Sequence, residues 1–482
     1  MRWRYIIHVV GALAFFLGLT MLFSLAVGIY YADTSLAPIL ISMGITLLIG
    51  GTIFFAFKGE KVGNITQREG MAIVFFGWTA VGFFGALPFF FGSQQISFTD
   101  AIFESVSGFT TTGASILTDI ESMAKGLLFW RSFIQWLGGM GIIVLSLAIL
   151  PFLNAGGMQL FKAEVPSPVP DKLKPRIKET AVLLWKVYIL LSVIQIVLLM
   201  FGGLTLYEAT CHTFTTMPTG GFSTKNASIA AYGSLYLDIV FIVFMLFAGI
   251  NFSLHYQLLR GKRLVFWQDA ECRLFLAIVL ALSLIVSINV YGEVYQNIGK
   301  AFQYGTFQVV SIITTTGFAT ADYEKWPAMS QLILLLCMII GASAGSTGGG
   351  VKILRVMLLF KYCARELFTL VHPRSITHIK INGKAVPEDV LRSVIGFLAL
   401  YIGLFAICVV ILAGMGVDFV TSIGAVAAAI GNIGPGFGAV GPVDNYAAIP
   451  MLGKWLLTWC MLLGRLEIYT VIIFLAPEFW RK

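Results

Sequence analysis

The sequence predicts an all-α polytopic membrane protein in which two extra N-terminal transmembrane helices precede four pseudo-repeats. Three observations lead to this prediction: an apolar composition, a series of long apolar segments, and a glycine phrase that recurs along the chain. Of the 482 residues, 58% are hydrophobic and only 12% are charged, whereas about a quarter of a typical soluble domain is charged. This composition excludes an ordinary soluble domain.

Ten segments are apolar for long enough to cross a membrane as helices, which takes roughly 20 residues. The first is too long for the apolar part of a signal peptide, about 7 to 15 residues, so we expect a retained anchor helix. The expected spans are 5–31, 37–57, 71–92, 127–153, 180–203, 235–259, 273–291, 328–360, 391–414 and 454–476.

Lys and Arg gather in alternate loops. When the N-terminus is placed in the cytoplasm, loops 58–70, 154–179, 260–272 and 361–390 and the C-terminal tail all fall on the same side and hold most of the basic residues. Cytoplasmic loops carry such an excess, so both termini are expected to be cytoplasmic. None of these loops is long enough for a folded domain, so any large regulatory module must come from another chain.

A phrase of threonine and glycine recurs in the outer loops. Aligning the last common glycine of each copy places Gly113, Gly221, Gly317 and Gly436 in register. Each copy follows a short apolar stretch, at 99–109, 206–216, 298–313 and 418–432. Such stretches are too short to span a membrane and fit re-entrant half-helices.

Four such segments in one chain are able to surround one axis. Irregular backbone at membrane depth is tolerated only where it lines water or is buried in protein, and rings of carbonyls replace the hydration shell of an ion in known filters. Glycine allows the four backbones to approach one another closely. The threonines add hydroxyl ligands or brace the loop. We therefore expect four repeats of helix, re-entrant half-helix, filter loop and helix around a central pore. For a single copy, a helix cap followed by a turn is the alternative.

The repeats divide the chain into five parts. They are 1–70 with the two N-terminal helices, 71–179, 180–272 and 273–390 as the first three pore repeats, and 391–482 as the fourth.

The motifs SGFTTTGAS, TMPTGGFST, IITTTGFAT and GNIGPGFG together resemble the Trk/Ktr/HKT superfamily of potassium transporters, most closely its Trk-type membrane subunits, over essentially the whole chain. The resemblance implies a multi-pass homodimer in the bacterial inner membrane that conducts K⁺, with membrane lipid around it. It also implies a cytosolic nucleotide-binding regulatory subunit, an RCK-like ring. K⁺ is then the permeant ion, and neither an organic cofactor nor a nucleic acid is expected.

By motif, the resemblance assigns the selectivity filter to four sets of residues. In the alignment above, Pro435 stands where Thr316 stands. Proline fixes a torsion and removes an N–H, so we expect a ring without true fourfold symmetry and with weak discrimination against Rb⁺ or Na⁺. The filter residues are Thr110, Thr111, Thr112, Gly113, Thr219, Gly220, Gly221, Thr314, Thr315, Thr316, Gly317, Ile433, Gly434, Pro435 and Gly436.

The span at 328–360 contains a stretch, 341–352, that is too rich in glycine to hold a helix well. The resemblance implies an intramembrane loop under the filter that acts as a gate; a kink or a tight helix-packing face is the alternative. Its candidate gate residues are Gly341, Gly345, Ser346, Thr347, Gly348, Gly349 and Gly350.

Arg465 lies near the middle of the last span, where a charge usually faces a cavity or a partner. We expect it to face the pore below the filter as part of the gate. A structural ion pair with Glu467 of a neighbouring protomer, or with another helix carboxylate, is the alternative.

Two other functions compete with a gated K⁺ pore. A Na⁺- or H⁺-coupled symporter would also use broken helices, but the repeats share one orientation and the spans show no obvious relay of Asp, Glu and His. A membrane enzyme would need a nucleophile, a base or metal ligands. The sequence has no HExxH and no paired carboxylates at membrane depth, so we do not expect an enzyme.

Overall fold

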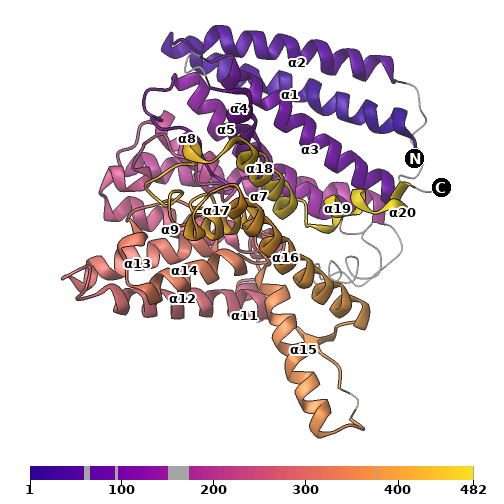
Figure 1. The fold of residues 1–482 in the computed structure, drawn as a ribbon, viewed down its shortest axis with the longest axis vertical. Coiled ribbons are helices and arrows are strands. Elements are labelled where there is room, and N and C mark those ends of the chain that lie inside the picture. Colours follow the sequence, from indigo (N-terminus) through magenta and orange to yellow (C-terminus); the bar gives the residue numbers. More distant parts are fainter. Residues whose placement is uncertain (59–65, 93–95, 150–172, 376, 481–482) are drawn as a thin grey trace.

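The computed structural model describes residues 1–58, 66–92, 96–149, 173–375 and 377–480, and the chain in these ranges is almost entirely helical (Figure 1). The strands in the described ranges are β1 (Lys380–Ile381) and β2 (Lys384–Ala385), which form a small antiparallel hairpin. Of the described helices, 6 are long and apolar enough to cross a membrane alone, or up to 8 when each bent pair is counted as one span. The predicted fold class, an all-α polytopic membrane protein, is confirmed.

The N-terminal hairpin consists of α1 (Trp3–Tyr31) and α2 (Leu36–Ala56), which lie side by side along one edge of the molecule (Figure 1). Small residues bring the two helices together, as is common in membranes. A Cβ added to Gly50 would lie 2.6 Å from the backbone nitrogen of Phe15, and one added to Gly11 would lie 2.6 Å from Ile53. The hairpin therefore depends on the absence of side chains at its glycines.

Four consecutive sets of helices follow, each with a long helix, a short buried helix and a second helix. The long helices are α3 (Gln67–Phe90), α7 (Leu173–Phe201), α12 (Ala270–Val290) and α16 (Glu388–Gly414). The short helices are α4 (Phe98–Phe109), α8 (Leu206–Thr216), α13 (Ile298–Ile313) and α17 (Phe419–Gly431). The second helices are α5 (Lys125–Ile149), α9 (Leu235–Gly249), α14 (Ala328–Ile340) and α18 (Met451–Arg465).

The four short helices confirm the predicted half-helices. Each begins at a polar residue whose side chain accepts a backbone N–H of the first turn; these caps are Ser97, Thr205, Asn297 and Asp418. Each then runs into the buried centre of the protein. Apolar residues at their C-terminal ends, such as Phe109 and Ile313, belong to the two main groups of buried apolar side chains.

Two predicted spans are wrong as continuous helices. At 235–259, α9 bends by 101° into α10 (Phe252–Leu259), because the side chain of Asn251 accepts the Ser253 N–H and starts a new helix. At 454–476, α18 is bent by 115° from the helical turns that follow it, α19 (Tyr469–Ile472) and η4 (Ile473–Leu475). Glu467, between them, has a φ of 59°, which ends a right-handed helix.

The span expected at 328–360 is broken, as predicted. Helix α14 ends at Ile340, and α15 (Ile353–Val371) begins after residues 341–352 and extends away from the body of the molecule (Figure 1). The basic loop expected at 154–179 lies mostly outside the described residues. The remaining helical turns are α11 (Val265–Gln268), α20 (Pro477–Trp480), η1 (Ser228–Tyr232), η2 (Tyr323–Lys325) and η3 (Tyr446–Ala448).

We predict that Gly50→Leu lowers the melting temperature of the purified protein, because its side chain would push α1 and α2 apart. Overpacking of this kind costs about 1–3 kcal/mol. Gly44→Leu in the same helix is the matched control, since a Cβ there meets nothing within 4 Å. Thermal unfolding in detergent measures both variants, and equal shifts would contradict the glycine-mediated contact.

Candidate functional site

The loops that follow the four short helices share one backbone course. We call them the glycine loops: residues 110–114, 218–222, 314–318 and 431–435. Each loop has a residue with φ between 52° and 58°. Two positions later comes a glycine with φ between 72° and 102°. The first residues are Thr111, Thr219, Thr315 and Asn432, and the glycines are Gly113, Gly221, Gly317 and Gly434.

The residue between these two positions is also equivalent in the four loops. Its N–H donates to the carbonyl five residues earlier, at 2.8–3.0 Å. This residue is Thr112, Gly220, Thr316 and Ile433 in the first to the fourth loop. We call their carbonyls the ring carbonyls.

The predicted register of the fourth copy is wrong. Gly434, and not Gly436, is equivalent to Gly317, so Ile433 and not Pro435 stands where Thr316 stands. The N–H of Gly436 instead donates to the carbonyl of Val440 at 2.7 Å, and its own carbonyl accepts the Tyr323 hydroxyl at 2.8 Å. Gly436 therefore belongs to the turn that leaves the fourth loop. Pro435 follows the ring position and does not remove an N–H from it.

The glycine loops contact one another in a closed ring. A Cβ added to the glycine of one loop would collide with the ring carbonyl oxygen of the next. The distances are 2.0 Å from Gly113 to Gly220, 1.9 Å from Gly221 to Thr316, 1.9 Å from Gly317 to Ile433 and 2.8 Å from Gly434 to Thr112. The four loops thus surround one axis in chain order, with the loosest contact where the fourth meets the first.

Two threonine hydroxyls in the first loop and two in the third brace these loops. Thr110 and Thr112 are joined by their hydroxyls at 2.7 Å, and Thr314 and Thr316 at 2.8 Å. Asn432 links the fourth loop to the first, because its Nδ2 donates to the Thr112 hydroxyl at 3.0 Å. Of the two roles expected for the threonines, these contacts favour bracing.

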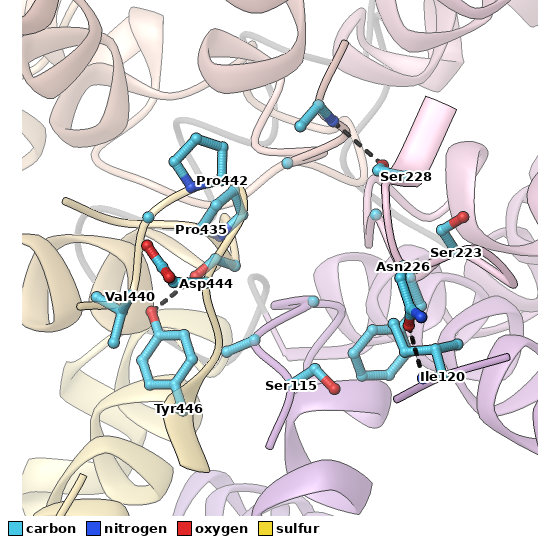
Figure 2. Close-up of a pocket in the computed structure, with 18 of the residues that line it drawn as sticks. Ser115, Ile120, Ser223, Asn226, Ser228, Pro435, Val440, Pro442, Asp444 and Tyr446 are labelled. Carbon is cyan, nitrogen blue, oxygen red and sulfur yellow. Dashed lines mark hydrogen bonds between the residues drawn. The ribbon is translucent and has the colours of Figure 1, made fainter. Parts of the chain in front are cut away.

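A small cavity of about 90 Å³ lies on the outer side of the ring, and all four of the equivalent glycines line it. Pockets for organic ligands are larger, about 300–1,000 Å³, so this space suits an ion or a few water molecules. Figure 2 shows Ser115, Asn226, Ser228 and Tyr446 around it, contributed by the chain segments that follow different glycine loops.

Four hydrogen bonds join neighbouring loops around this cavity, and we call them the outer collar. The Ile120 N–H donates to Asn226 at 2.7 Å, the Ala319 N–H to Ser228 at 3.2 Å, the Tyr323 hydroxyl to Gly436 at 2.8 Å, and the Tyr446 N–H to Ser115 at 2.8 Å. Two of them are drawn in Figure 2 as dashed lines, at Asn226 and Ser228. The collar connects the first loop to the second, the second to the third, the third to the fourth and the fourth to the first.

Two carboxylates support the collar from outside the membrane-spanning helices. Asn226 donates to Asp119 at 3.0 Å, and this hydrogen bond lowers the pKa of the Asp119 carboxyl. Glu324 accepts the N–H of Gly438, but its partial burial raises the pKa of its carboxyl. Asp119 therefore remains a charged acceptor for Asn226 at neutral pH.

Residues 341–352, which we call the intramembrane loop after the sequence prediction, lie against the C-terminal ends of the short helices. The Gly349 N–H donates to the Thr315 hydroxyl at 2.8 Å, and the Thr347 hydroxyl donates to the Met217 carbonyl at 2.9 Å. A Cβ on Gly349 would lie 2.3 Å from the carbonyl oxygen of Gly431. The intramembrane loop thus contacts three of the four glycine loops, or the short helices that precede them, on the side opposite the outer collar.

Arg465, the last residue of α18, contacts this loop. Its Nη1 donates to the Thr347 carbonyl at 2.7 Å, and the side chain is buried. Its other two nitrogens have no hydrogen-bond partner within the described part of the chain. The neighbouring Glu467 does not pair with Arg465 in this chain, since it binds Arg355 and, at 3.4 Å, Lys352.

Two residues missed by the sequence analysis form a buried ion pair beside the ring. Arg131 on α5 and Glu104 on α4 lie 2.6 Å apart. The Arg131 guanidinium also donates to the Ser223 carbonyl at 3.0 Å and lies 3.5 Å from the centre of the Phe222 ring. Charges in otherwise apolar segments are the sequence signal for such a pair.

The oxygens that surround the axis suit a hard monovalent cation. They are neutral backbone carbonyls, which bind such a cation without the charge that would hold it fast. Within the described residues, no group of three or more His, Cys, Asp or Glu side chains is placed to hold a metal ion.

We predict that Gly317→Ala abolishes or alters ion flux in proteoliposomes, because its Cβ would collide with the Ile433 carbonyl oxygen. The matched control is Gly292→Ala. Gly292 has a similar φ, 87° against 80°, but a Cβ there meets nothing within 4 Å. Both variants carry the backbone strain of a positive φ, and Gly317→Ala alone disturbs the ring. Equal flux through both would show that the close contact is unimportant.

Comparison with known proteins identifies the family. The family model TrkH, described as a cation transport protein, matches residues 36–482. The Trk system potassium uptake protein TrkH of Escherichia coli (strain K12) is 41% identical and that of Vibrio parahaemolyticus 40% identical, each over 100% of both chains. The crystal structure of the potassium transporter TrkH from Vibrio parahaemolyticus matches with a TM-score of 0.92 and 38% identity, again over 100% of both chains. The chain, with its four glycine loops closed around one axis, belongs to the TrkH family of cation transport proteins.

Proposed function

We propose that this chain takes up K⁺ across the bacterial inner membrane through a gated pore whose selectivity filter is formed by the four glycine loops. The observation that carries the proposal is the closed contact between each glycine and the ring carbonyl of the next loop. Four backbone carbonyls around one axis are able to replace the hydration shell of a K⁺ ion. The names of the relatives, potassium uptake protein and potassium transporter, support the choice of ion.

The short helices favour a cation at the ring. Each ends at a glycine loop, and the C-terminal end of a helix carries roughly half a negative charge from its unpaired carbonyls. Four such ends attract a cation without placing a carboxylate on the axis. Asn432 and Ile433 stand where the first and third loops have threonines, so the ring departs from fourfold symmetry. We therefore expect weaker discrimination against Rb⁺ and Na⁺ than a symmetric ring provides.

The intramembrane loop and Arg465 form the gate in this proposal. The loop lies against the inner side of the glycine loops, and Arg465 is bonded to it through Thr347. A guanidinium with two unpaired nitrogens places a positive charge where a cation would leave the filter. Both must move before ions pass. The buried Glu271 accepts the N–H groups of Ala344 and Leu354 near the two ends of the loop. Movement of the middle of the loop would break the hydrogen bonds of Thr347 and Gly349.

We propose that both termini are cytoplasmic and that the chain functions as a homodimer with a cytosolic nucleotide-binding subunit, as the family resemblance implies. The basic residues of the inner loops support the orientation. The name of the relatives, which assigns them to a Trk system, supports further subunits. The division into 1–70 and four pore repeats remains a prediction.

We predict that Arg465→Ala raises basal ⁸⁶Rb⁺ uptake into K⁺-loaded proteoliposomes. Loss of the positive charge should lower the free-energy barrier to cation passage, and a change of about 1.4 kcal/mol in that barrier corresponds to a factor of ten in rate. Arg465→Lys keeps the charge and should remain near the basal rate. Arg273→Ala, which removes an exposed arginine from α12, is the matched control. Unchanged uptake in Arg465→Ala would contradict the gate.

The same assay distinguishes a pore from coupled transport. A pore carries ⁸⁶Rb⁺ down its gradient without a second ion, whether or not Na⁺ or a pH gradient is present. Uptake that requires either one would replace the pore with a Na⁺- or H⁺-coupled K⁺ symporter.

A further inference from the structure

We infer that Gln135, on α5, is a positioning residue that holds the Gly220 carbonyl in the ion path and thereby sets the discrimination between K⁺ and Na⁺. The inference rests on the proposed function, because it assigns the Gly220 carbonyl to the filter. It concerns a side chain outside the glycine loops that the motifs do not mark.

The second glycine loop has a weak point in its backbone. The ring positions of the first, third and fourth loops carry the β-branched residues Thr112, Thr316 and Ile433. The ring position of the second loop is Gly220. A β-branched side chain restricts its own backbone and packs in one preferred orientation. The peptide between Gly220 and Gly221 has a glycine on each side, so no Cβ hinders its rotation. Without outside support, this carbonyl would be free to turn away from the axis.

Gln135 supplies that support with both ends of its amide. Its Nε2 donates to the Gly220 carbonyl at 2.8 Å, and its Oε1 accepts the Phe222 N–H at 3.2 Å. The two hydrogen bonds lie on either side of Gly221 and fix the peptides before and after it. The Gln135 side chain is 0% exposed, so water does not compete for these bonds.

The same side chain fills the space that Gly220 leaves empty. A Cβ on Gly220 would lie 2.4 Å from Cδ of Gln135. The amide therefore takes the volume that a threonine or isoleucine side chain occupies in the other loops. Gly220 and Gln135 form a matched pair, and neither is explained without the other.

One face of α5 is shaped to hold Gln135 against the loop. Residues four apart on a helix share a face, and Arg131 and Gly139 lie four positions before and after Gln135. Arg131 donates to the Ser223 carbonyl and is anchored by Glu104. At Gly139, a Cβ would lie 2.5 Å from Pro218. The second loop is thus fixed to α5 from Pro218 to Ser223.

The other ring carbonyls have no such partner. Among the hydrogen bonds of the described residues, none from a side chain reaches the carbonyl of Thr112, Thr316 or Ile433. Beside the third loop, the α9 side chain that contacts Phe318 is the apolar Phe241, with ring centres 5.4 Å apart. A hydrogen-bond donor on one of the four carbonyl oxygens restrains that carbonyl and makes its electrostatic environment different from that of the other three.

The test is the K⁺/Na⁺ permeability ratio of Gln135→Leu in proteoliposomes. Leucine keeps most of the volume but removes both hydrogen bonds. The ratio should fall about three- to tenfold, the factor that the loss of one net hydrogen bond represents. Gln195→Leu is the matched control, because Gln195 is also a buried glutamine, on α7, and its amide has no hydrogen-bond partner within the described residues. A merely structural role for Gln135 would lower the melting temperature and leave the ratio unchanged.

A compensating pair keeps the inference testable if Gln135→Leu does not fold. Gly220→Thr alone should fail to transport, because its side chain collides with Gln135. Gly220→Thr combined with Gln135→Ala has room for the threonine, makes the second loop similar to the first and third, and should recover transport. If Gly220→Thr alone transports as well as the double variant, the inference is overturned.

The outcomes separate the inference from the proposed function. If Gly317→Ala changes ion flux or selectivity and Gln135→Leu leaves the ratio unchanged, the inference fails and the filter stands. If neither change has an effect, the glycine loops are not the filter and both fail.

Discussion

The structure depends on the direct contact of backbone with backbone at the four glycine loops. At three of the four contacts, a single Cβ would lie about 2 Å from the neighbouring carbonyl oxygen. Irregular backbone at membrane depth is tolerated only where it lines water or is buried in protein, and three layers of protein surround it here. The short helices end at the glycine loops. The outer collar joins the loops by hydrogen bonds on one side, and the intramembrane loop lies against them on the other. The outer collar and the intramembrane loop make hydrogen bonds between different repeats.

The ring is built by four repeats that are alike in backbone and unlike in side chains. The torsions agree closely from loop to loop, while the bracing differs. Hydroxyl pairs stabilise the first and third loops, Gln135 stabilises the second, and Asn432 joins the fourth to the first. Because the four loops belong to one chain and have different sequences, a substitution is able to change the position of one ring carbonyl without changing the other three. Its cost is that each loop needs its own partners.

Much of this architecture is predictable from the sequence. The half-helices are bounded by polar caps and by glycine, so their limits follow closely; 206–216 and 298–313 agree with the structure at both ends. The broken span at 341–352 follows from helix propensity, because its glycines favour irregular backbone. The repeats could be recognised because glycine recurs where one loop lies against the carbonyl of the next.

The rest depends on contacts that a linear pattern does not carry. Gly434 and Gly436 both fit the phrase, and only the backbone torsions and the turn at Val440 show which one belongs to the ring. The bend after Gly249 depends on the cap supplied by Asn251, and the segment around it is apolar enough to fit a continuous span. Gln135 lies 85 residues from the loop it supports, so no local motif includes both.

The central claim is that the four ring carbonyls form one K⁺ site. Anomalous diffraction from crystals soaked in Rb⁺ tests it most directly, because Rb⁺ replaces K⁺ and is located by its own scattering. The claim predicts a peak on the axis in contact with the carbonyl oxygens of Thr112, Gly220, Thr316 and Ile433, weakened by Gly317→Ala. A fully occupied Rb⁺ elsewhere in the protein, with no peak inside the ring, would contradict it.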